Sequence, residues 1–182
     1  MENRTKMEAN PNKNQSKMLS GMFSDRRSTE DAYDTLYKRG YNKEDINLMM
    51  SEDTRNKHFS ADDTEVGSKA MEGAKTGSAI GGVLGAAVGI IAAIGTSVAI
   101  PGLGLIVAGP LAVGILSAGA GGVTGGVIGA LIGSGISEER AKLYESGVND
   151  GKIVMGVHPR NQDDAKYFQD EWNSLKAEQV YY

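Results

Sequence analysis

The chain contains two histidines, the side chains best suited to metal binding or general-base chemistry near neutral pH. His58 is followed by carboxylates that offer the oxygen ligands preferred by a hard cation. These carboxylates are Asp62, Asp63 and Glu65. A solvated acidic loop around His58, and a position at the end of a strand for His158, explain both histidines more simply. We therefore predict no metal site.

The glycine-rich part of the chain lacks a complete phosphate-binding motif. A phosphate loop requires Gly-x4-Gly-Lys-Ser/Thr, in which backbone N–H groups surround the phosphates. The closest approach is Gly73-Ala74-Lys75-Thr76, which has an extra residue between glycine and lysine. The sequence also lacks the dinucleotide motif Gly-x-Gly-x-x-Gly and contains no cysteine, which excludes thiol chemistry. We expect no enzyme activity, no cofactor and no small-molecule substrate.

Several aromatic side chains fall at helical spacing on apolar faces: Tyr33, Tyr37, Tyr144, Phe168 and Trp172. Aromatic rings of this kind can stack on nucleic-acid bases, but such proteins also present a basic surface. The net charge of this chain is −4, with no basic tail. We therefore assign these rings to the protein core and predict no nucleic-acid partner.

The most informative feature of the chain is a run of 62 uncharged residues, 76–137, in which glycine recurs at every fourth position. Residues four apart stack on one face of a helix, and a face of glycines lets a second helix backbone approach closely. In water each glycine would cost roughly 0.5–1 kcal/mol of helix stability relative to alanine. Close packing must offset that cost. The predicted helix-packing interface comprises Gly73, Gly77, Gly81, Gly85, Gly89, Gly114, Ala118, Gly121, Gly122, Gly125, Gly126, Gly129 and Gly133.

The uncharged run predicts a hairpin of two long apolar helices. Thr76–Ala99 contains 24 residues and would be about 36 Å long as a helix. It is therefore longer than the segment of roughly 20 residues that crosses a bilayer core. Pro101 and Pro110 bracket Gly102–Gly109, where neither helix continues readily. Leu111–Gly135 would be the second helix, and its two adjacent small-residue stripes indicate two neighbours: the hairpin partner and a second subunit.

The segment before this run, residues 17–54, predicts a strand–helix–strand unit. Its strands are an apolar stretch from Met18 to Phe23 and a second from Ile46 to Met50. Between them, Ser28 is placed to cap a helix that Gly40 ends. The flanking residues 1–16 are predicted to be a disordered tail, and residues 55–75 a polar connector.

The segment after the run, residues 137–182, predicts helix, strand, helix and a short last strand. Ser137 and Asn161 are the expected helix caps, and Ile153–Val157 is a strand of the buried type. With its first helix set aside, the two segments have the order βαββαβ of ferredoxin-like folds. We expect an α+β, ferredoxin-like domain interrupted at residues 76–136 by the glycine-zipper helical hairpin.

Three stretches of this chain resemble the bacterial heat-induced general stress proteins and related low-temperature-induced proteins. They are MFSDRRSTEDAYDTLYKRGYNKEDINLMM (Met22–Met50), the core from Gly77 through IPGLGLIVAGPLA to Gly133, and GISEERAKLYESGVNDGKIVMGVH (Gly135–His158). The resemblance implies a stress-induced, membrane-associated protein of undefined molecular function. It carries over no catalytic or ligand residue.

These observations predict a non-enzymatic stress-response protein that forms homo-oligomers through the hairpin, which is inserted in or attached to the cytoplasmic membrane. Membrane lipid is then a partner, and both termini are expected to be cytoplasmic because residues 1–16 lack the apolar core of a secretory signal. The alternative is a soluble, closed assembly with the hairpins buried inside and the α+β domains outside. The Gly- and Ala-rich composition and the missing aromatic belt favour this alternative. A pore is a third interpretation, although no polar residues mark a path for ions.

Overall fold

The fold is built on a six-stranded antiparallel sheet with the strand order β3-β4-β2-β5-β1-β6. A computed structural model describes residues 17–59, 98–100, 104–117 and 126–182. The strands are β1 (Leu19–Phe23), β2 (Ile46–Ser51), β3 (Val98–Ile100), β4 (Leu105–Ala108), β5 (Ile153–Val157) and β6 (Glu178–Tyr181). The helices are α1 (Arg26–Lys38), α2 (Glu52–His58), α5 (Pro110–Ser117), α7 (Gly126–Gly133), α8 (Glu138–Asn149) and α9 (Gln162–Ser174). The predicted α+β class is confirmed.

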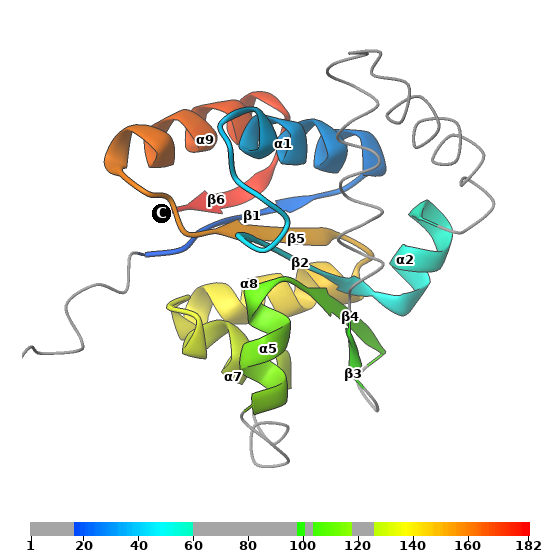
Figure 1. The fold of residues 1–182 in the computed structure, drawn as a ribbon. Helices are drawn as coiled ribbons and strands as arrows, with labels where there is room; N and C mark the ends of the chain where they lie inside the picture. The colour runs from blue at the N-terminus through cyan, green and yellow to red at the C-terminus, as the bar shows by residue number, and fades with distance from the viewer. Residues whose placement is uncertain (1–16, 60–97, 101–103, 118–125) are drawn as a thin grey trace, which may run out of the picture.

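Helices cover both faces of the sheet, with α1 and α9 on one side and α5, α7 and α8 on the other (Figure 1). Successive strand residues point to opposite faces, so β5 places Ile153 under α1 and α9 and Val154 under α8. Trp172 of α9 packs edge-on against Phe23 of β1, with 5.6 Å between the ring centroids. The sheet thus separates two apolar cores.

The strand–helix–strand unit forms as predicted, with two local differences. Helix α1 begins earlier than expected, because Asp25 rather than Ser28 is the N-cap and its carboxylate accepts the Ser28 N–H at 2.8 Å. Gly40 follows the end of α1 in the left-handed region at φ +78°, as predicted. Of the five aromatic residues assigned to the core, four are buried, but Tyr37 is 57% exposed.

The predicted connector, residues 55–75, begins inside a helix. Helix α2 starts at the N-cap Ser51, whose hydroxyl accepts the Thr54 N–H at 3.1 Å, and continues to His58. Phe59 then packs against the core beneath α1. The remainder of the connector and the predicted tail, residues 1–16, lie outside the described residues.

The long helical hairpin predicted for residues 76–136 is not what the described residues form. Val98 and Ala99, expected at the end of the first helix, belong to strand β3, and Leu105–Ala108 forms strand β4 beside β2. The predicted single helix Leu111–Gly135 is wrong, because α5 and α7 are separate helices that pack side by side. Most of Thr76–Ala99 lies outside the described residues. A continuous apolar run suits a buried strand as well as a buried helix, and here pairing with β2 selects the strand.

The start of α5 is fixed to the sheet by two short contacts. Gly109, at φ +86°, lies so close to β2 that an added Cβ would be 2.1 Å from the Ile46 carbonyl oxygen. One residue on, the buried Asn47 side chain accepts the Leu111 backbone N–H through Oδ1 at 2.7 Å. Strand β2 therefore supplies the cap of α5 from outside the helix and its preceding loop.

We expect Asn47→Ala to lower the free energy of unfolding by about 1–3 kcal/mol, because it leaves the buried Leu111 N–H unpaired. Urea unfolding followed by fluorescence of Trp172, the one tryptophan and fully buried, measures this change. Asn56→Ala on the exposed side of α2 is the control and should change stability little. Equal unfolding midpoints for the two variants would show that Asn47 does not cap α5.

Candidate functional site

An exposed apolar surface formed by α5 and α7 is the first candidate site. Each helix is eight residues long and contains no charged side chain. One side packs on the sheet through the buried Leu111 and Leu131. The other side leaves Val113 67% and Ile132 43% exposed. We call Val113, Gly129, Ile132 and Gly133 the α5–α7 surface.

The glycines on this surface face open space. No described atom lies within 4 Å of a Cβ built at Gly129 or at Gly133. Within the described part of the chain, these two residues therefore make no close helix contact of the predicted kind. Substitution at either position meets no steric obstacle among the described residues.

The other members of the predicted helix-packing interface are placed as follows. Gly114 lies in α5 and Gly126 begins α7. The rest lie outside the described residues: Gly73, Gly77, Gly81, Gly85, Gly89, Ala118, Gly121, Gly122 and Gly125. Of the predicted interface, the structure thus places Gly129 and Gly133 of α7 on the α5–α7 surface.

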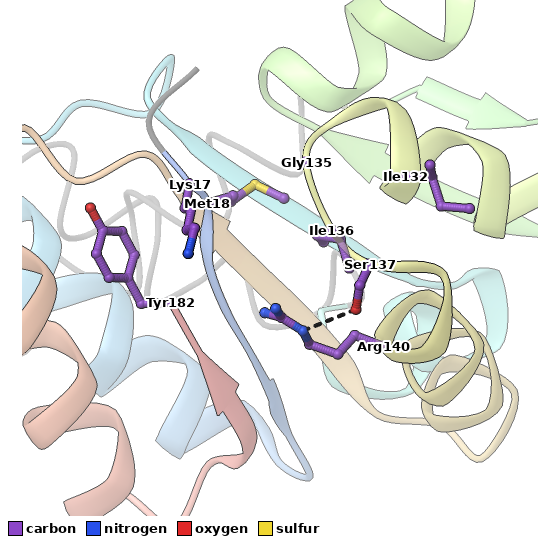
Figure 2. Close-up of a pocket in the computed structure, with 8 residues that line it drawn as sticks. All are labelled: Lys17, Met18, Ile132, Gly135, Ile136, Ser137, Arg140 and Tyr182. Atoms are coloured by element: carbon purple, nitrogen blue, oxygen red, sulfur yellow. Dashed lines mark hydrogen bonds between the residues drawn. The ribbon is translucent and has the colours of Figure 1, made fainter. Parts of the chain in front are cut away.

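A cavity of about 310 Å³ opens beside this surface, at the turn between α7 and α8 (Figure 2). We call it the α7–α8 cavity. Its apolar residues are Met18, Ile132 and Ile136, and its polar residues are Lys17, Ser137, Arg140 and Tyr182, with Gly135 in the turn. In Figure 2, Lys17 and Tyr182 lie across the cavity from Ser137 and Arg140.

Helix α8 positions the cationic side of the α7–α8 cavity. Ser137 is its N-cap but makes no side-chain capping bond; its hydroxyl instead accepts from Arg140 Nε at 3.2 Å. The Arg140 guanidinium also lies over the Tyr181 ring, 4.9 Å from the centroid. One turn further along, Tyr144 donates to the Gln179 carbonyl oxygen at 2.8 Å, which holds β6 against α8.

Burial at this junction affects the ionisation of Tyr144. Desolvation raises the pKa of Tyr144 to about 12, although the nearby Ser20 hydroxyl acts in the opposite direction. The phenol therefore stays protonated at neutral pH and continues to donate to β6.

Sequence reasoning missed the α7–α8 cavity because its walls are far apart in the chain. Lys17 precedes β1, Arg140 is in α8, and Tyr182 follows β6. Only the pairing of β1 with β6 and the packing of α8 beneath them bring these residues together. Lys17 and Tyr182 thus join Arg140 from segments that are distant from it in sequence.

A connected polar cluster lies on the α1–α9 side. Asp164 is 7% exposed and accepts hydrogen bonds from Arg39 Nη1 at 2.5 Å and from the Tyr41 hydroxyl at 2.7 Å. The Tyr41 hydroxyl in turn accepts the Arg160 N–H at 2.8 Å, and the Arg160 guanidinium stacks on the Tyr41 ring. Both carboxylate oxygens are occupied, so this cluster joins α1 to α9 and offers no free base.

The histidines and the phosphate-loop candidate do not form a described site. His158 lies at the exposed end of β5, as predicted. His58 ends α2, while its neighbouring carboxylates Asp62, Asp63 and Glu65 and the Gly73–Thr76 segment lie outside the described residues. No group of metal-ligating side chains occurs in the part of the chain that the structure describes.

None of the helices in the described part of the chain combines the length and the apolar character that a membrane crossing requires. The resemblance to stress proteins rests on the motifs quoted above. Comparison of the chain with protein-family models, with curated proteins and with solved structures gives no match.

Proposed function

We propose that this protein is a non-enzymatic stress-response protein that self-associates and attaches to the cytoplasmic membrane through the α5–α7 surface. The observation that carries the proposal is the exposure of Val113 and Ile132 on two helices without any charged residue. Helices that are apolar on every side are normally covered by another surface. The stress context comes from the family resemblance alone.

The self-association half of the proposal rests on the open glycines of α7. Gly129 and Gly133 are four residues apart, so they share one helix face that carries no side chain. A helix of a second copy can approach such a face more closely than it can approach any other helix surface. Two identical copies would present this face to each other in a symmetric contact.

We expect Gly129→Leu to weaken self-association roughly tenfold or more, because the leucine side chain holds the two helix backbones apart. The open space at Gly129 means that the fold itself should tolerate the change. Size-exclusion chromatography with light scattering measures the oligomer over a range of protein concentrations.

The control for this substitution is Asn173→Leu, which adds an exposed leucine to α9 on the opposite side of the sheet. Asn173→Leu should leave the oligomer unchanged, and circular dichroism should show that both variants are folded. An unchanged oligomer for Gly129→Leu would show that the α7 glycines are not an interface.

The membrane half of the proposal is attachment rather than crossing by the described helices. An eight-residue helix is about 12 Å long, whereas the hydrocarbon core is roughly 30 Å thick. The same shortness favours the second candidate function, a soluble closed assembly in which the α5–α7 surfaces cover one another.

Lysis without detergent, followed by pelleting of membranes and an alkaline carbonate wash, distinguishes membrane attachment from the soluble assembly. Protein in the supernatant as a large particle would support the soluble assembly.

We also infer that β1, α1, β2, β5, α9 and β6 form a ferredoxin-like unit. Two features support this interpretation: the antiparallel order β2-β5-β1-β6 and the position of α1 and α9 on one face of the sheet. The remaining described elements extend the sheet with β3 and β4 and cover its second face with α5, α7 and α8. The proposed contact surface then lies on the face opposite α1 and α9.

A further inference from the structure

We propose that the α7–α8 cavity binds the phosphate headgroup of an anionic phospholipid. This inference rests on the proposed attachment to a membrane and names the lipid class that the surface would recognise. The cavity volume of about 310 Å³ lies at the lower end of the range for ligand pockets, roughly 300 to 1,000 Å³.

The charges around the cavity favour an anion. Lys17 and Arg140 line the same cavity, and neither has a carboxylate within ion-pair distance among the described residues. Glu138 of α8 is paired with Lys142 at 2.8 Å. Two cationic side chains that line one cavity can both donate charge-assisted hydrogen bonds to a bound phosphate.

The hydrogen bonds already present orient Arg140 for such a role. Its Nε is held by Ser137 Oγ, and its planar group rests on the Tyr181 ring. The guanidinium is therefore fixed at two points, and in Figure 2 it extends from the Ser137 side toward Lys17. Preorganisation of this kind lowers the entropy cost of binding a ligand.

The apolar side of the cavity indicates a lipid rather than a soluble phosphate. Ile132 lines the cavity and is also part of the α5–α7 surface, so the cationic and apolar regions are continuous. Tyr181 and Tyr182 are each 38% exposed beside them. Exposed apolar residues bordered by tyrosine, lysine and arginine are the arrangement that proteins use at the boundary between headgroups and acyl chains.

The test measures binding of the purified full-length protein to two kinds of vesicle by flotation. One kind contains phosphatidylcholine alone, and the other contains phosphatidylcholine mixed with phosphatidylglycerol. We expect tighter binding to the anionic vesicles, reduced on the order of fivefold by Arg140→Gln and similarly by Lys17→Gln. Lys166→Gln, which removes one exposed cation from α9 on the other side of the sheet, should preserve the preference.

Three outcomes would overturn the inference in different ways. Equal binding to both vesicles, or a preference that survives Arg140→Gln, rejects the headgroup site and leaves membrane attachment standing. Binding to neither vesicle rejects membrane attachment itself, and the headgroup site with it. A third result would be that the protein binds neither vesicle but is stabilised against unfolding by inorganic phosphate, and that Arg140→Gln abolishes this stabilisation. That result would identify a soluble phosphate ligand in place of the lipid.

Discussion

Gly109→Ala is expected to lower the free energy of unfolding by roughly 2–5 kcal/mol, from overpacking and from a left-handed backbone conformation. The added Cβ would lie 2.1 Å from the Ile46 carbonyl oxygen and 2.9 Å from its carbonyl carbon. Both are backbone atoms of β2, a strand paired on both edges, so they cannot move aside as a side chain can. The loss is a large share of the 5–15 kcal/mol that stabilises a typical domain.

Gly104→Ala separates the two contributions to this loss. Gly104 also has a positive φ, +59°, but no described atom lies within 4 Å of its Cβ position. It should therefore lose only the conformational part, about 1–2 kcal/mol. Urea unfolding monitored by Trp172 fluorescence compares the two variants. If Gly109→Ala proves no worse than Gly104→Ala, the contact between the β4–α5 turn and β2 does not contribute to stability.

Asp164→Asn is expected to lower the free energy of unfolding by about 1.5–3 kcal/mol at neutral pH, because hydrogen bonds to an ionised group are stronger than neutral ones. The carboxylate receives Arg39 on one oxygen and Tyr41 on the other. The asparagine amide has an NH2 group in place of one carboxylate oxygen. That group donates and so cannot accept the hydrogen bond from Arg39 or Tyr41 that it would face. The junction between α1 and α9 would lose its main polar link.

The pH dependence of this effect follows from the ionisation of Asp164. Burial opposes ionisation of the carboxyl, but the hydrogen bonds from Tyr41 and Arg39 outweigh it, so the pKa of Asp164 is lowered below 3.8. A lowered pKa stabilises the folded state above the unfolded pKa, about 3.9 for aspartate. That stabilisation is lost as the pH falls through the folded pKa. The difference in the free energy of unfolding between wild type and Asp164→Asn should therefore be largest near pH 7 and decrease below about pH 4.

Asp170→Asn is the matched control, since it makes the same change on the same helix. Asp170 pairs with Lys166 at 2.6 Å, but both side chains are largely exposed, so the pair should contribute less than about 1 kcal/mol. The proposed role of Asp164 would be contradicted if Asp164→Asn lowered the free energy of unfolding no more than Asp170→Asn does. It would also be contradicted if the effect of Asp164→Asn did not change with pH.

The sequence by itself determined the local elements on both sides of the apolar run. Caps, turn glycines and apolar periodicity are local signals, and they correctly placed α8 after Ser137 and α9 after Asn161. They also predicted β5 at Ile153–Val157 with its observed bounds. The predicted cap Ser28 was wrong, because aspartate serves at that position as well as serine does and Asp25 caps α1.

Only the tertiary structure decided how the apolar run is used. Leu105–Ala108 is compatible in sequence with either a strand or a buried helix, and its pairing with Leu48–Ser51 is a contact between distant segments. The α7–α8 cavity likewise depends on the β1–β6 pairing, which brings Tyr182 near Lys17. Local patterns specify what a segment can form, whereas strand pairing and the approach of Gly109 to β2 select among the possibilities, because long-range contacts have no local signature.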